Sequence, residues 1–246
     1  MEWTDDAIVL GVRPFGEHSA VLEALTRSHG RHLGLVRGAS SKRTKGMLEP
    51  GNILSLHWRA RLDQQLGNYS LELVAARAAH FFEDALKLDG LTAACAMCAA
   101  TLPEREVHGR VYDALDGLLQ MMMRERSPDW VKSHVEFELV LLEDLGFGLD
   151  LSQCAVTGAK SGLTHVSPKT GRAVTAVAAR PYAGRLLPLP PFLVSHAYTA
   201  DVTQLAEGLA LTGFFLERIV LEPHGGVMPL ARLRLTQRLA ADKADR

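Results

Sequence analysis

The chain has 246 residues, of which 47% are hydrophobic and 22% charged, and its formal net charge at pH 7 is −1. This composition excludes the disordered and fibrous classes of protein, and the length suits one large domain or two to three small ones. No apolar run reaches the roughly 18 residues that a membrane-spanning helix needs.

The compartment is indicated by the first residues and by the cysteines. Three carboxylates and no basic segment precede the first apolar run, which is not the pattern of a secretory signal or a transit peptide. Three cysteines, an odd number, argue against a disulfide framework and for a reducing compartment. We therefore expect a cytoplasmic protein with no membrane partner.

Residues 1–80 are expected to form five short strands, separated by glycine-containing turns. The expected strands cover residues 7–13, 20–26, 31–37, 52–60 and 69–77. In the fourth, Leu54, Leu56 and Trp58 alternate with polar residues, which gives one face for a core and one for solvent. Five strands with a longer connection after the third fit a five-stranded OB-fold β-barrel, with a β-sandwich fragment or an SH3-like barrel as alternatives.

After residue 80 the apolar period changes from 2 to 3.6, which predicts an α-helical domain. Helices are expected over 81–101, 105–124 and 129–145, the third with Ser127 as N-cap and Gly146 after its end. Residues 151–190 are rich in turn-forming residues, which predicts an inserted module or a linker. A long apolar helix over 201–221 and a short basic helix over 230–241 follow. The overall class is therefore α+β and multidomain.

Positive charge is concentrated in the strand region, although the whole chain is nearly neutral. Between residues 27 and 61 there are eight lysines and arginines and one carboxylate, Glu49. Clustered cations bind phosphate backbones through counterion release. The candidate DNA-binding residues are Arg13, Arg27, Arg31, Arg37, Lys42, Arg43, Lys45, Arg59 and Arg61. Phe15, Trp58 and Tyr69 are available for base stacking, but the position of Trp58 on the apolar face predicts a core residue.

Two cysteine-containing segments were considered as reactive or metal sites. Cys95 and Cys98 share one face of an expected helix, so a redox pair is geometrically open, but their apolar neighbours would raise the thiol pKa values and favour inert core residues. Cys154 and His165 lie in a segment whose spacing of turns and ligand-type residues resembles a zinc ribbon in which the other ligands have been replaced. We expect this module to bind no metal. The alternative is a zinc ion held with ligands from outside the segment.

No motif of an enzyme was found in the sequence. The nucleophile elbow, the phosphate-binding loop and the His-Glu-x-x-His motif are absent, and Gly146-Phe147-Gly148 lacks the third glycine of a dinucleotide fingerprint. This favours a binding protein with no catalytic residues and no cofactor.

Several segments together resemble the bacterial RecO family of recombination mediators. The resemblance is carried by residues 7–22, by 25–30 with Val36-Arg37-Gly38-Ala39, by 137–151 followed by Cys154-x-x-Thr157-Gly158, and by the turn at 166–171. It implies an N-terminal OB-fold domain (1–80), a helical domain in two parts (81–150 and 191–246) and a degenerate zinc-ribbon-like module (151–190). Thr157 replaces one zinc ligand of the metal-bearing members, and the second cysteine pair is missing.

The resemblance also implies a function without covalent chemistry. RecO proteins bind single- and double-stranded DNA, anneal complementary strands and act with RecR to load RecA onto strands coated by single-strand DNA-binding protein. The basic C-terminal residues Arg232, Arg234 and Arg238 would extend the DNA surface, contact the tail of single-strand DNA-binding protein, or form a solvated helix face. An RNA-binding OB-fold protein and a protein adaptor acting through the acidic middle segment are the alternatives.

Overall fold

The computed structural model describes residues 1–182, 184–195 and 198–244, so the expected segments 151–190 and 191–246 each include positions outside the described residues. The chain forms two compact units, residues 1–124 and 125–246, which are described separately. Among the described residues, no helix has both the length and the apolar character to cross a bilayer.

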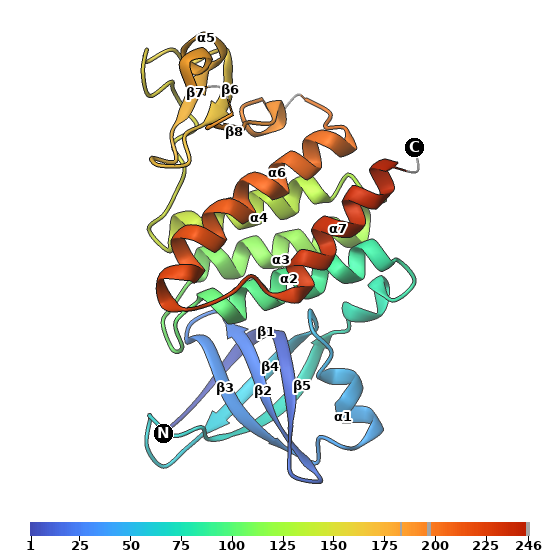
Figure 1. Ribbon diagram of the computed structural model, residues 1–246. Helices are drawn as coiled ribbons and strands as arrows, with labels where there is room; N and C mark the ends of the chain where they lie inside the picture. Colours follow the sequence, from blue (N-terminus) through green and yellow to red (C-terminus); the bar gives the residue numbers. More distant parts are fainter. Residues whose placement is uncertain (183, 196–197, 245–246) are drawn as a thin grey trace. The chain divides into compact units, whose positions relative to one another are not determined.

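The first unit begins with a closed barrel of five strands in the order β1-β2-β3-β5-β4 (Figure 1). Pairing is antiparallel except between β3 and β5, and β4 closes the ring against β1. Because β5 lies between β3 and β4 and the ring is closed, the OB-like barrel is confirmed and the alternative of a sandwich is not. The strands are β1 (Glu2–Phe15), β2 (Ser19–Thr26), β3 (Gly30–Arg37), β4 (Ile53–Arg59) and β5 (Asn68–Ala75).

The barrel interior is filled by alternate residues of each strand. Leu54, Leu56 and Trp58 of β4 are fully buried, so the predicted core face of this strand is confirmed. The Trp58 indole Nε1–H donates to the carbonyl of Leu66 at 3.0 Å, which satisfies its polar atom inside the core. Trp58 is therefore a core residue, as predicted, and is not available for base stacking.

Gly34 is needed where β3 passes the Tyr69 ring. A Cβ atom on Gly34 would lie 2.3 Å from Cδ2 of Tyr69. The ring cannot move freely, because it is buried and its hydroxyl is 2.7 Å from Nδ1 of the buried His32. Burial lowers the pKa of His32 to about 4, so this imidazole is neutral at physiological pH.

We therefore expect Gly34→Ala to destabilise the first unit by about 1–3 kcal/mol, as overpacking of a filled core does. Gly46→Ala is the matched control, because a Cβ there meets nothing within 4 Å. Urea unfolding followed by tryptophan fluorescence measures both. An unchanged midpoint for Gly34→Ala would show that the Tyr69 ring can yield.

A short helix, α1 (Lys42–Met47), lies between β3 and β4, where the sequence predicted only a longer connection. Ser41 caps it, with its side-chain oxygen accepting from the Thr44 N–H at 3.2 Å. Met47 and Leu48 anchor the end of α1 in the barrel core. The basic side chains of α1 are thus held on a fixed element of the barrel.

The first unit ends with a 3-10 turn (Ala78–Phe81) and the helices α2 (Ala85–Thr101) and α3 (Gly109–Arg124). Helix α2 begins later than predicted because Asp84 caps it, accepting from the N–H groups of Leu86 and Lys87. Helix α3 begins later because Arg105 has a left-handed φ of 66°. Cys95 and Cys98 are buried in α2 and burial raises their pKa values, to about 12 for Cys95, which confirms the inert reading.

The second unit contains α4 (Val131–Asp144), α6 (Val202–Phe215) and α7 (Leu230–Ala244), with a π-helical turn (Leu216–Leu221) after α6. Gly146 ends α4 as predicted, because its N–H and that of Phe147 bond back to Glu143 and Leu142. The prediction of Ser127 as N-cap was wrong. A turn precedes α4, Trp130 takes the cap position, and Ser127 Oγ accepts from the Trp130 indole instead.

A small module lies between α4 and α6. Its sheet has the order β7-β6-β8, formed by Leu163–Val166 (β6), Ala173–Thr175 (β7) and Leu187–Pro188 (β8). Short helical turns, α5 (Ala176–Ala179), Arg180–Tyr182 and Pro191–Leu193, complete it, and a further turn (Glu222–His224) precedes α7. The predicted three-part plan of barrel, helices and small insertion is confirmed as a fold class.

Candidate nucleic-acid interface

The strand register places two arginines at the ends of one row of paired residues, with the uncharged Val21, Leu35 and Asn68 between them. Arg13 pairs with Val21, Val21 with Leu35, Leu35 with Asn68, and Asn68 with Arg59. Paired residues share a face of a sheet, and neighbouring strands are about 4.8 Å apart. This row therefore runs around the barrel for roughly 19 Å, with an arginine at each end.

A second row of paired residues places an aromatic ring and a cation on the same outer face of the barrel. Phe15 pairs with Ser19 and Ser19 pairs with Arg37, so the three side chains share the outer face of β1, β2 and β3. Phe15 is 57% exposed although it is apolar. Of the three aromatic residues considered for stacking, Phe15 alone is exposed, because Trp58 and Tyr69 are buried.

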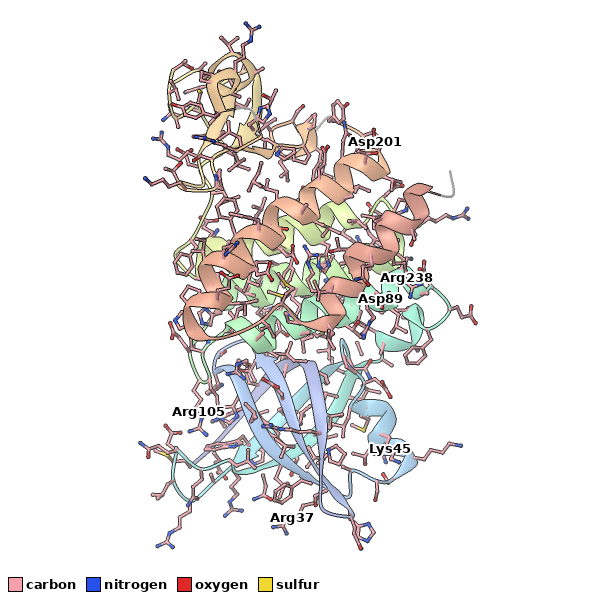
Figure 2. The ribbon with its side chains drawn as sticks, viewed as in Figure 1. Arg37, Lys45, Asp89, Arg105, Asp201 and Arg238 are labelled. Carbon is pink, nitrogen blue, oxygen red and sulfur yellow. The ribbon has the colours of Figure 1, made fainter. Side chains whose placement is uncertain are left out.

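Arg37 continues into the basic side chains of α1. We name Arg37, Lys42, Arg43 and Lys45 the α1 surface. All four are exposed, and none of their side chains has a hydrogen bond or ion pair with any residue that the structure describes. Figure 2 shows Lys45 extending outward from α1 and Arg37 at the end of β3. Without intramolecular partners, these cations are available to phosphate groups.

The groove beside α1 joins two of these cations to the barrel. It has a volume of about 640 Å³ and is lined by Arg37 of β3, Arg43 and Met47 of α1, and Tyr69 and Leu71 of β5, among others. A second cavity of about 360 Å³ lies on the β1–β2 side of α1, and its charged lining residues are Lys45, Glu17 and Glu49. The basic groove is therefore the one on the β3–β5 side of α1.

Arg59 and Arg61 are also exposed, at the end of β4 and in the loop that follows it. Arg59 Nε is 4.0 Å from a Glu2 carboxylate oxygen, and both side chains are largely exposed. An ion pair of this kind contributes little to stability. Both arginines therefore remain candidates for phosphate contact.

Two of the predicted DNA-binding arginines are already engaged within the first unit. Arg27 pairs with Asp113 of α3 at 2.9 Å and lies over the Tyr112 ring. Arg31 pairs with Glu23 at 2.5 Å and donates to the Leu102 carbonyl at 2.7 Å. The cation cluster inferred from sequence is therefore divided, because the segment after α2 covers this end of the barrel face.

Arg105 has a role that the sequence analysis missed. Its guanidinium donates to the carbonyl oxygens of Asp63 and Gln65 in the β4–β5 loop, and its backbone N–H bonds to Arg31 at 2.8 Å. In Figure 2 it lies on the other side of the barrel from Lys45. Arg105 fixes the loop that carries Arg61. Nothing in its acidic sequence neighbourhood signals this contact.

The three C-terminal arginines have different environments. Arg232 is 2% exposed, and its guanidinium donates to both carboxylate oxygens of Glu138 at 2.5 and 2.9 Å. Arg234 and Arg238 are exposed on α7, and both interact with other residues. Arg232 is committed inside the second unit, so we do not include it in a DNA or partner surface.

Comparisons with known proteins agree with these observations. Family models described as "Recombination protein O N terminal" and "Recombination protein O C terminal" match residues 1–77 and 83–226. The chain is 48% identical to DNA repair protein RecO of Rhodospirillum centenum over 97% of this chain and 94% of the relative. It is 45% identical to DNA repair protein RecO of Caulobacter vibrioides over 99% of this chain and 100% of the relative.

The chain belongs to the RecO family. RecO proteins serve DNA repair and recombination and are not enzymes.

The residues of the small module do not fit the zinc site of metal-bearing RecO proteins. A structural zinc ion needs four sulfur or nitrogen ligands, and no group of three or more His, Cys, Asp or Glu side chains suited to a metal occurs among the described residues. The turn at Ser167 is closed by the Gly171 N–H bonding to the Ser167 carbonyl at 2.9 Å.

Both remaining residues of zinc-ligand type are engaged within the module: His165 Nδ1 is 2.8 Å from Thr164 Oγ1, and Cys154 makes a hydrogen bond of its own. Its Sγ accepts the Thr175 N–H at 3.4 Å. Burial opposes the thiolate, but hydrogen bonds from Thr157, Thr175 and Val156 lower the pKa of Cys154 to about 6. Hydrogen bonding and packing therefore hold the turns of this RecO protein together.

Proposed function

We propose that this RecO protein binds single- and double-stranded DNA through the α1 surface and the outer face of its barrel, and that it anneals complementary strands there. The observation that carries the proposal is a set of exposed cations on one short segment of an OB-like barrel, whose side chains have no partner among the described residues: Arg37, Lys42, Arg43 and Lys45. Such a surface contacts phosphates without regard to sequence.

Annealing follows from charge screening. Two DNA strands repel one another through their phosphates, and a cationic surface lowers that repulsion while base pairing reads the sequence. Arg13 and Arg59, at the two ends of the first register row, extend the contact area beyond α1. The surface supplies no reactive group, consistent with a binding role.

The proposal includes the wider RecO pathway. With RecR, the protein would help to load RecA onto strands coated by single-strand DNA-binding protein. The acidic tail of that protein needs cations beside an apolar groove. Arg234 and Arg238 on the second unit are the cations that we propose for it, since Arg232 is buried.

The experiment is annealing of complementary oligonucleotides precoated with single-strand DNA-binding protein, with and without RecR. We expect the protein to accelerate duplex formation on coated strands. Coated complementary RNA is the control for the alternative RNA-binding function. Acceleration of RNA pairing alone would contradict the proposal.

Phe15 provides a separate prediction about single strands. Because its ring is exposed on the same barrel face as Arg37, Phe15→Ala is expected to weaken binding of single-stranded DNA by about 1–3 kcal/mol, the range for loss of one stacked base. Duplex binding should change little, since paired bases are not open to stacking. Anisotropy titrations with both forms measure the difference, and equal losses for both would argue against stacking.

A further inference from the structure

One strand of the barrel has an unpaired edge. Strand β5 pairs with β4 from Asn68 to Ala75, but with β3 only at Asn68 and Tyr69. Among the residues that the structure describes, no backbone group pairs with Ser70–Leu73 on the β3 side. An exposed edge of this kind presents N–H and C=O groups that can pair with another strand. A bulge at Val74 ends the regular edge.

The inner face of β5 is also incompletely covered at this edge. Tyr69, Leu71 and Leu73 share one face because strand residues alternate. Tyr69 is buried, whereas Leu73 is 39% exposed. The ring is therefore closed between β3 and β5 by only two residue pairs, and beyond them an apolar side chain from an added strand would cover Leu73.

A groove with basic side chains runs along the open edge. Its cavity of about 730 Å³ lies between α1 and β5 and is lined by Arg43, Met47, Leu71, Glu72 and Leu73, among others. Arg43 also lines the neighbouring cavity of about 640 Å³ with Arg37. Across the two cavities the lining contains two arginines, Arg37 and Arg43, and one carboxylate, Glu72, which leaves one positive charge in excess.

We propose that an extended acidic segment of a partner protein, with apolar side chains at alternate positions, pairs with β5 at Ser70–Leu73. Strand addition uses the free backbone groups for affinity and the apolar pocket at Leu73 for specificity. A peptide is favoured over nucleic acid because no exposed aromatic ring lines this groove for base stacking. The inference goes beyond DNA binding and does not depend on it.

The test is fluorescence anisotropy of the full-length protein with a fluorescein-labelled hexapeptide of alternating aspartate and valine. Leu73→Asn, which changes no charge, is expected to weaken peptide binding at least fivefold and to leave oligonucleotide binding unchanged. Arg43→Ala should weaken both. Arg61→Ala, in the β4–β5 loop, is the control that should leave peptide binding intact.

A second peptide separates strand pairing from simple attraction of charges. With proline in place of valine, the charge is kept, but the N–H groups of alternate residues and the extended backbone of a regular strand are lost, so we expect at least tenfold weaker binding. Equal binding of the two peptides, no binding of the valine peptide, or no effect of Leu73→Asn would each overturn the proposal. Weaker oligonucleotide binding by Leu73→Asn would instead assign the groove to DNA. Unfolding midpoints of the variants establish that they are folded.

Discussion

Replacing Arg37, Lys42 and Arg43 together by alanine is expected to weaken binding of a single-stranded oligonucleotide on the order of a hundredfold at low salt. The estimate assumes about 1 kcal/mol for each lost phosphate contact. The slope of log K against log salt should fall by about 2 for single strands and nearly 3 for duplex, since each contact releases about 0.7 to 0.9 counterions. Stability should be unchanged, because these side chains have no partners among the described residues.

A matched control removes the same charge from the second unit. The small module carries three exposed cations outside the barrel residues: Lys160, Lys169 and Arg180. Replacing all three by alanine should leave the salt slope within error of wild type. Anisotropy titrations at several salt concentrations compare the two triple variants. An equal loss of slope in both would mean that DNA binding reflects net charge and not the α1 surface.

Replacing Arg232 by methionine is expected to lower the free energy of unfolding by about 3–5 kcal/mol, because it leaves the carboxylate of Glu138 buried without its counter-charge. Glu138 is 0% exposed, and its other close contacts are Thr212 Oγ1 at 2.5 Å and His134 Nε2 at 3.4 Å. Neither neighbour carries a fixed positive charge that could replace the guanidinium. Urea unfolding measures the loss.

The double variant Glu138→Gln, Arg232→Met is the control for this pair. Removing both charges leaves no buried ion, so the double variant should recover most of the stability that Arg232→Met loses. If Arg232→Met were as stable as wild type, the buried pair would not be formed in solution.

The same pair predicts a dependence on pH. Burial raises the pKa of Glu138, but the Arg232 guanidinium and His134 more than offset this and hold that pKa well below its ordinary range. A carboxyl group with a lowered pKa in the folded state stabilises the protein above its unfolded pKa of about 4.3, and this contribution is lost as the pH falls further. The stability difference between wild type and Arg232→Met should therefore shrink below about pH 4.3, as unfolding at pH 7 and pH 3 would show.

The barrel was predictable from sequence because its signals are local. Alternation in 52–60 identified Leu54, Leu56 and Trp58 as core, and glycine-containing turns separated the strands. The end of α4 was equally predictable, since Gly146 adopts the left-handed conformation that a helix C-terminus favours. Such features depend on neighbours in the chain and so can be read from it.

The candidate site was only partly predictable, because it depends on contacts between distant residues. Arg27 and Arg37 are alike in sequence, yet Arg27 meets Asp113, 86 positions away, and Arg37 meets no described partner. From the sequence, Arg232 is indistinguishable from the exposed arginines of the same helix. In the structure it is paired with Glu138 of α4. Ion pairs between residues far apart in the chain determine which cations remain available to phosphate groups. Such pairs cannot be predicted from composition.

The most direct test of the α1 surface as the DNA-binding site is the rate of annealing of bare complementary oligonucleotides, followed by fluorescence energy transfer between labelled strands. We predict that wild type and the Lys160, Lys169 and Arg180 control accelerate annealing equally, and that the Arg37, Lys42 and Arg43 variant does not. Full annealing activity in that variant would contradict the assignment.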